Sequence, residues 1–226
     1  MIRAIFFDAV GTVLFPTPSA SSLYVQVAAK HGLKLEEADV RARLWTQYRT
    51  EEALDRAGDW ATSEAREVAR WQNIVQQAIP HATPELFTEL YRHYATPDAW
   101  ALAPDTAEVL VELAHRGYIL GLASNYDRRF LSVVAGHSGL APLADRVVVS
   151  SIVGTRKPGP AFFRAVLASS GCDPEQILFI GDDIENDIHG ASAAGFRTVL
   201  IDPQAKHAHI TPRVQYLREL LPALSR

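Results

Sequence analysis

Ile2-Arg3-Ala4-Ile5-Phe6-Phe7-Asp8-Ala9-Val10-Gly11-Thr12-Val13-Leu14 is the stretch of sequence that decides the fold. Its first part, residues 2–7, is a short and mainly apolar run, typical of a strand buried on both faces. Asp8 ends this run and is followed by small residues and a Gly-Thr pair. Ligands of open α/β sheets gather at the carboxyl ends of strands, so Asp8 stands where chemistry is expected. A strand-end Asp more often only begins a turn, but three later strand-end clusters favour the functional interpretation.

Composition limits the class of protein. The chain has 226 residues, of which 48% are hydrophobic and 21% charged, which predicts a packed core in one large domain or in one domain with an insertion. The formal net charge is −4, and acidic and basic residues are interspersed without a basic cluster, so we expect no nucleic-acid partner. Cys172 is the one cysteine, which fits a reducing compartment. No signal peptide and no apolar run of about 20 residues is visible, so we expect a cytoplasmic protein with no membrane partner.

The pattern divides the chain into two kinds of segment. Residues 17–96 show helical spacing throughout, with four helices and no strand-like alternation, and predict a four-helix bundle inserted after the first strand. Residues 97–226 alternate apolar strand-like runs with helices, which together with residues 1–16 predict a parallel sheet covered on both faces. The predicted fold class is therefore α/β, with a Rossmann-like parallel sheet core and an inserted helical cap domain. Oligomeric state is left open by these patterns.

Polar side chains follow later strands of the predicted sheet. Ser124-Asn125, Lys157 and the run Asp182-Asp183-Ile184-Glu185-Asn186-Asp187 lie at or just after strand ends, which share one edge of a parallel sheet with Asp8. Carboxylates gathered at one point repel each other unless a hard cation neutralises them, and oxygen ligands without a His or Cys pair favour Mg²⁺ over zinc. A serine hydroxyl and a lysine can hold an oxyanion that a neighbouring Asp attacks.

The chain resembles the haloacid dehalogenase superfamily of hydrolases, in the form with a helical cap inserted after the first motif. Four motifs carry the resemblance, in the family's order and over nearly the whole chain: Phe6–Thr12, Leu122–Asn125, Arg156–Phe163 and Ile180–Ala191. Each motif is weak alone, whereas the four together are a strong signal.

The resemblance implies a role for each site residue. Asp8 is expected to be the nucleophile and a metal ligand, and Asp182 to bind Mg²⁺ directly. The backbone carbonyl of Val10 and the side chain of Asp187, directly or through water, are further expected ligands, with Asp183 a weaker candidate. Ser124, Asn125 and Lys157 are expected to bind the phosphate. Catalysis is thus assigned to Asp8, Ser124, Lys157 and Asp182, and the expected partner is a small phosphorylated molecule.

Val10 is a departure from most phosphatases of this superfamily, which carry there a second Asp that protonates the leaving oxygen. A missing general acid typically costs about 10²–10⁴-fold in rate, and more for a basic leaving group. Asp127, His189 and residues of the predicted cap are candidate replacements. The expected activity is a Mg²⁺-dependent phosphatase that forms an aspartyl-phosphate on Asp8 and is slow or prefers a good leaving group. Within the superfamily, the chain resembles most a subgroup that lacks this second acid but keeps the acids of the fourth motif.

Other functions stay open. A 2-haloacid dehalogenase expels a halide that needs no proton, but its fourth motif lacks the metal-binding acids, and its halide-binding arginine would fall at about Thr46. A phosphonoacetaldehyde hydrolase needs a cap lysine, and only Lys30 and Lys34 are available. The third alternative is a degenerate protein that binds a phosphorylated molecule or a protein partner without turnover.

Aromatic residues are frequent in the predicted bundle. They include, with one residue from the linker that follows the bundle, Trp45, Tyr48, Trp60, Trp71, Tyr91, Tyr94 and Trp100. They could form a lid over a substrate, but their helical spacing favours the bundle core, except for Trp60 in a loop and Trp100 in a linker.

Overall fold

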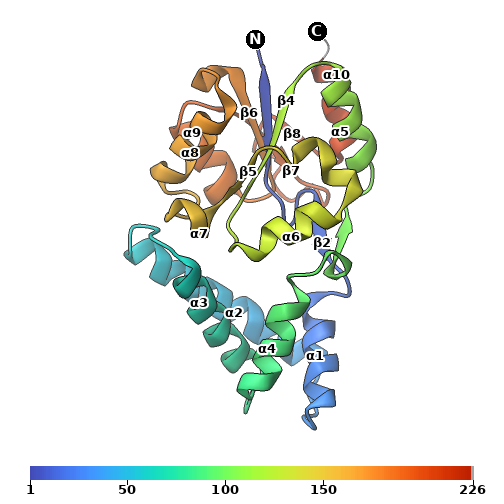
Figure 1. Ribbon diagram of the computed structural model, residues 1–226, viewed down its shortest axis with the longest axis vertical. Helices are drawn as coiled ribbons and strands as arrows, with labels where there is room; N and C mark the ends of the chain where they lie inside the picture. The colour runs from blue at the N-terminus through green and yellow to red at the C-terminus, as the bar shows by residue number, and fades with distance from the viewer. Residues whose placement is uncertain (225–226) are drawn as a thin grey trace.

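A six-stranded parallel sheet with helices on both faces forms one half of the molecule in the computed structural model, which describes residues 1–224 (Figure 1). The strand order is β5-β4-β1-β6-β7-β8, and every neighbouring pair is parallel. The strands are β1 (Ala4–Phe7), β4 (Ile119–Ser124), β5 (Val147–Val149), β6 (Ile177–Gly181), β7 (Arg197–Ile201) and β8 (Arg213–Val214). The predicted α/β class with a parallel sheet is confirmed.

Strand β1 lies near the middle of the sheet and is fully buried, as its apolar sequence predicts. Side chains alternate between the two faces of a strand. Ile5 and Phe7 therefore join the apolar core on one face, whereas Ala4 and Phe6 join the core on the other. The helices around the sheet are α5 (Thr106–His115), α6 (Arg129–Gly136), α7 (Ser150–Val153), α8 (Pro160–Ser170), a π-helix (Ile184–His189), α9 (Gly190–Ala193) and α10 (Leu220–Ala223).

Four helices precede the return to the sheet and lie together at its far end from the two termini (Figure 1). These helices are α1 (Ala20–Lys30), α2 (Glu37–Ala57), α3 (Glu64–Ala78) and α4 (Pro84–His93), and they are called the helical insertion below. Two of these helices begin with a side-chain cap, since Ser63 and Thr83 accept hydrogen bonds from backbone N–H groups in the first turns of α3 and α4. Buried residues from all four helices form an apolar core of their own.

The connections to the insertion differ from the sequence prediction. Residues 14–16 and 100–102, in which the sequence pattern indicates no strand pairing, form a two-stranded antiparallel ribbon of β2 (Leu14–Pro16) and β3 (Trp100–Leu102). Apolar burial of Leu14 and Trp100 favours this pairing, because it holds both entrances to the insertion against the sheet's core. Near the other end of the chain, Arg213–Val214 forms the short edge strand β8, and the helical turn of α10 begins only at Leu220.

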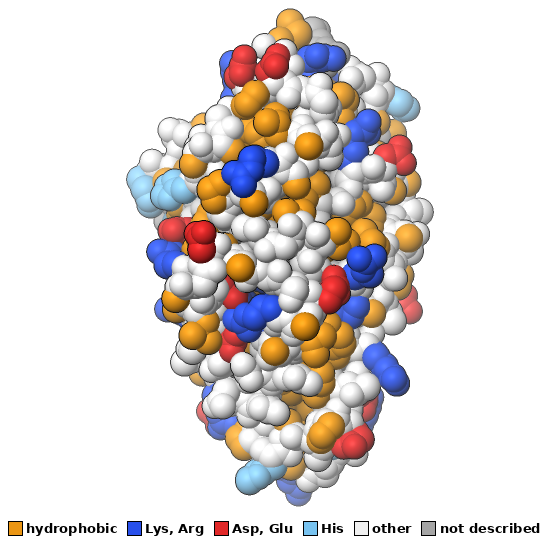
Figure 2. Space-filling model, turned by 60° about the vertical axis from the view of Figure 1, so that its left-hand side comes forward, with side chains coloured by type: hydrophobic (Ala, Val, Ile, Leu, Met, Phe, Trp, Pro, Cys, Tyr) orange, Lys and Arg blue, Asp and Glu red, His pale blue; other side chains and the backbone are white. Residues whose placement is uncertain are grey.

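Charged side chains of both signs are mixed over the face drawn in Figure 2. Within residues 1–224, none of the helices combines the length and apolar composition needed to cross a membrane.

Candidate active site

The carboxyl ends of three adjacent strands build the site. Asp8 directly follows β1, Ser124 ends β4, and Asp182 directly follows β6, and β1 lies between the other two strands. The backbone N–H of Asp8 donates to the carbonyl of Ile180 over 2.7 Å, which ties the end of β1 to the end of β6. The predicted convergence of distant residues is therefore produced by the strand order.

Three carboxylates meet at this edge. Oxygen atoms of Asp8, Asp182 and Asp187 lie within 4.8 Å of one another. Although Asp182 as a residue is exposed, desolvation of its carboxyl group and the charge of Asp8 raise its pKa to about 7. Burial raises the pKa of Asp187 to about 8, against the opposing effect of Lys157. Burial is the largest cause of both pKa shifts, and repulsion between the neighbouring carboxylates adds to it.

Lys157 is the cation of the cluster and is only 2% exposed. Its Nζ donates to Asp8 Oδ1 over 2.6 Å, to Asp187 Oδ1 over 2.7 Å and to the carbonyl of Ala123 over 3.0 Å. Burial alone would lower the pKa of this ammonium group, but the carboxylates of Asp187 and Asp8 hold it above its ordinary value. Lys157 is therefore charged and fixed beside one oxygen of Asp8.

The other oxygen of Asp8 faces Thr12, a residue to which the sequence assigned no role. The Thr12 hydroxyl lies 3.3 Å from Asp8 Oδ2 and 3.2 Å from Asp182 Oδ1, so it can donate to either carboxylate. Gly11 makes room for this arrangement: its φ is +99°, and a Cβ there would lie 2.3 Å from Asp182 Oδ2. The Gly-Thr pair after Asp8 was the available signal for both features.

The remaining predicted site residues have distinct positions. Ser124 is buried at the end of β4. The Asn125 side chain holds the backbone of Lys157, since its Nδ2 donates to the carbonyl over 3.0 Å and its Oδ1 accepts from the N–H over 2.7 Å. The Asp183 side chain accepts from the N–H groups of Glu185 and Asn186 at the start of the π-helix, and lies outside the three-carboxylate cluster. Asn125 and Asp183 thus both have structural hydrogen bonds of their own.

The donor set fits a hard divalent cation. Three carboxylates and one ammonium leave two negative charges, which one Mg²⁺ ion neutralises. Asp8, Asp182 and Asp187 are the residues that would hold it, and no His or Cys belongs to this cluster of described residues. The backbone carbonyl of Val10 as a further ligand stays a prediction.

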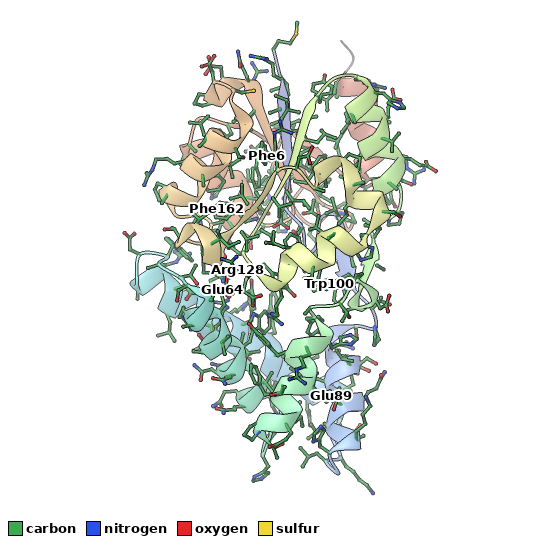
Figure 3. The ribbon with its side chains drawn as sticks, in the orientation of Figure 1. Phe6, Glu64, Glu89, Trp100, Arg128 and Phe162 are labelled. Carbon is green, nitrogen blue, oxygen red and sulfur yellow. The ribbon has the colours of Figure 1, made fainter. Side chains whose placement is uncertain are left out.

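Ion pairs connect the helical insertion to the loop that carries Lys157. Arg156 is buried and pairs with Glu67 of α3 and, over 3.3 Å, with Asp55 of α2. Residue 156 also donates its backbone N–H to the carbonyl of Trp60 over 2.8 Å. Figure 3 shows a second contact nearby, where Glu64 of α3 meets Arg128 at the start of α6 and accepts its backbone N–H over 3.1 Å. No sequence pattern indicates these contacts, because their partners lie far apart along the chain.

A cavity of about 880 Å³ lies between the insertion and the sheet. Val10, Asn125, Tyr126 and Arg156 line its sheet side. Val10 is two residues from Asp8 in the sequence, and the Asn125 side chain holds the backbone of Lys157. The prediction that most aromatic residues of the insertion form its core is wrong for the following residues, which line the cavity: Trp45, Tyr48, Trp71 and Tyr91.

The other aromatic residues have different positions. Tyr94 packs against the insertion's apolar core and also lines the cavity. Trp100 lines the cavity, whereas Trp60 does not. Helical spacing identifies a common face but not what that face meets.

Asp127, a candidate for the missing acid, is occupied elsewhere. Its carboxylate is buried, pairs with Arg129 over 2.7 Å and accepts the Tyr91 hydroxyl over 2.9 Å. Both oxygens of Asp127 are thus held by Arg129 and Tyr91, so its carboxyl group is not free to reach a leaving oxygen.

Comparison with known proteins agrees with this architecture. A family model described as "Hydrolase: haloacid dehalogenase-like hydrolase" matches residues 2–195. Haloacid dehalogenase-like hydrolase domain-containing protein 3 of Homo sapiens is 27% identical, over 99% of this chain and 94% of its own length. Phosphoserine phosphatase of Thermus thermophilus is 30% identical, over 78% of this chain and 71% of its own length.

Two solved structures share the fold. The HAD-hydrolase YfnB from Bacillus subtilis, bound to magnesium, superposes with a TM-score of 0.78 at 22% identity, covering 100% of this chain and 99% of its own. An L-2-haloacid dehalogenase superposes with a TM-score of 0.76 at 21% identity, covering 98% of both chains. Both likenesses concern the fold, which phosphatases and dehalogenases have in common.

Proposed function

Because the chain belongs to the haloacid dehalogenase-like hydrolase family, we propose that it is a Mg²⁺-dependent phosphatase acting on a small phosphorylated molecule through Asp8. The observation that carries the proposal is the position of Asp8. One of its oxygens is paired with the buried Lys157, and the other faces Thr12 and Asp182. A carboxylate beside a fixed ammonium and two further acids is suited to meet a phosphate together with a divalent cation.

The reaction takes two steps. An Asp8 oxygen attacks phosphorus, and the bond from phosphorus to the leaving oxygen breaks, with its electron pair going to that oxygen. Water then attacks the aspartyl-phosphate at phosphorus, which restores the Asp8 carboxylate, and the proton lost by water balances the one taken up by the departed oxyanion. Lys157 stays charged and stabilises the phosphoryl oxygens in both steps. Mg²⁺, when bound, supplies further charge neutralisation for the phosphate.

Val10 makes the first step selective. Its side chain is apolar, 39% exposed and part of the cavity wall, so it has no proton for the leaving oxygen. Asp127, held by Arg129, does not replace it. We therefore expect slow turnover of alkyl phosphates and faster turnover of donors whose leaving group is weakly basic.

Dehalogenation is the second candidate, because Val10 and the apolar cavity suit a halide as leaving group. The halide-binding arginine of the dehalogenases would fall at about Thr46. This residue is exposed, and its hydroxyl donates to the carbonyl of Ala42 within α2. The three clustered carboxylates also have no use in a metal-free dehalogenase. These two features favour the phosphatase.

Turnover of three substrate classes tests the proposal. Phosphate release from phosphate esters and acyl phosphates, and halide release from 2-haloacids, are measured with Mg²⁺ and with EDTA, using Asp8→Asn as the blank. We expect phosphate release that needs both Mg²⁺ and Asp8. Halide release that persists in EDTA would replace the proposal with a dehalogenase. If no substrate is turned over but calorimetry detects binding of Mg²⁺ and inorganic phosphate, the chain is a binding protein and not an enzyme.

A further inference from the structure

We propose that the natural donor is an aryl phosphate: a phosphate monoester whose leaving oxygen is attached to a bulky, uncharged aromatic group that fills the cavity. This inference rests on the proposed phosphatase function and narrows its substrate class. Three independent features of the cavity carry it: its size and aromatic walls, the neutralised charges of its lining, and the side chain that faces the leaving group.

The size of the cavity and the chemistry of its walls restrict the donor to one with a bulky leaving group. A volume of about 880 Å³ is near the upper end of ligand pockets, roughly 300–1,000 Å³, and far exceeds what a two- or three-carbon phosphate needs. Aromatic rings come from several elements. Trp45 and Tyr48 of α2 are stacked, with ring planes 6° apart, and Trp71 of α3 and Tyr91 of α4 complete the insertion side. Such walls favour a ligand with a bulky aromatic group, which buries its apolar surface against them.

Charge sets the second limit. The charged side chains of the lining are Arg41, Glu67, Arg129 and Arg156. Each has an ionic partner: Glu37 for Arg41, Asp127 for Arg129, and the Arg156–Glu67 pair for the other two. Arg129 and Arg156, the least exposed cations of this lining, are thus compensated by buried carboxylates, whereas the Arg41–Glu37 pair is exposed to solvent. The part of the donor that reaches the buried wall is therefore uncharged.

The leaving group sets the third limit. Val10 stands on the cavity wall beside Asp8, where an alkoxide would need a proton. A phenol has a pKa of about 10, as tyrosine shows, whereas a simple hydroxyl is several units more basic. The tyrosines of the wall are weak replacements, since burial raises the pKa of Tyr48 and of Tyr126 above the ordinary value. An aryl oxide leaves without this help and takes its proton from water afterwards.

Four donors separate the ring from the leaving group. With Mg²⁺, kcat/KM is measured for 2-naphthyl phosphate (aromatic, weakly basic leaving group), benzyl phosphate (aromatic, alkoxide), acetyl phosphate (small, weakly basic) and phosphoserine (small, charged, alkoxide). We expect naphthyl phosphate to exceed benzyl phosphate by at least about 10²-fold. We expect the KM for naphthyl phosphate to lie roughly tenfold or more below that for acetyl phosphate, because ring burial contributes binding.

The outcomes distinguish the two proposals. The aryl phosphate inference is overturned if kcat/KM for benzyl phosphate or phosphoserine equals that for naphthyl phosphate. It is also overturned if the KM for acetyl phosphate is as low as that for naphthyl phosphate. Either result leaves the proposed phosphatase function in place. No phosphate release from any of the four donors overturns the phosphatase itself, and this inference with it.

A matched pair of variants tests the cavity directly. Ala42 lines the cavity, whereas Ala53 lies exposed on the same helix and outside the lining. Ala42→Trp should raise the KM for naphthyl phosphate at least about tenfold more than the KM for acetyl phosphate, because the indole occupies the space of the ring. Ala53→Trp should change neither constant. If Ala42→Trp leaves the ratio of the two KM values unchanged, the cavity is not the ring's binding site and the inference falls.

Discussion

At the scale of single residues, we expect Val10 to decide which phosphates the proposed phosphatase cleaves. We predict that Val10→Asp raises kcat for benzyl phosphate by about 10²–10⁴-fold, because it restores an acid beside the leaving oxygen. The gain for 2-naphthyl phosphate should be much smaller, since its aryl oxide needs little protonation. Steady-state kinetics with both donors in saturating Mg²⁺ measure the difference.

Val10→Asn is the control for this change, because asparagine has nearly the same shape as aspartate and is polar but donates no proton as an acid. It should give no comparable gain. Equal gains from the two substitutions would mean that polarity, and not proton donation, limits the native site.

Gly11 is the residue on which the position of Asp182 depends. We predict that Gly11→Ala weakens Mg²⁺ binding roughly 10–100-fold, because its Cβ would lie 2.3 Å from Asp182 Oδ2 and displace that carboxylate. Isothermal titration with MgCl₂ measures the affinity. Gly32→Ala is the matched control: its φ is also positive, at +79°, but a Cβ there meets nothing within 4 Å. A similar loss of Mg²⁺ affinity in both variants would assign the effect to backbone strain alone.

At the scale of the elements, Arg156 links α2 and α3 to the loop that positions Lys157. We predict that Arg156→Met lowers the free energy of unfolding by about 3–5 kcal/mol, because it leaves the buried carboxylate of Glu67 without its ionic partner. Arg56→Met should lower the free energy of unfolding by at most about 1 kcal/mol, because both side chains of the Arg56–Glu185 ion pair are exposed to solvent. Urea unfolding measures both values, and equal losses would contradict a special role for the buried pair.

The elements that the sequence predicts well are those whose own residues determine them. Apolar runs such as Ile177–Gly181 form the strands, and Ser63 and Thr83 begin helices where a capping side chain is expected. The ribbon of β2 and β3 was missed because each of its strands has three residues, too few for an alternation pattern. Its pairing depends on a partner some 85 positions away, which no local pattern records.

At the scale of the whole molecule, the same distinction separates the carboxylate cluster from the cavity. The convergence of Asp8 and Asp182 was predictable, because all strands of a parallel sheet end at one edge. The aromatic wall was not, because Trp71 has the same spacing whether its face meets the bundle core or an open space. Deciding between the two requires the docking of the insertion on the sheet, which rests on buried pairs such as that of Arg156 with Glu67.

We expect charge compensation at this sheet edge to couple Mg²⁺ binding to the stability of the whole fold. We predict that Mg²⁺ at 100 times its dissociation constant stabilises the protein by about 2.7 kcal/mol, and that calorimetry shows this as a rise in Tm of roughly 5–10 °C. Asp182→Asn should act in two opposite ways. It raises Tm without Mg²⁺, because it removes a carboxylate whose pKa is raised to about 7 by desolvation and by Asp8. It also reduces the Mg²⁺-induced rise, because it removes a ligand. If the Asp182→Asn variant loses stability without Mg²⁺ but keeps the full rise with it, the cation binds away from this cluster.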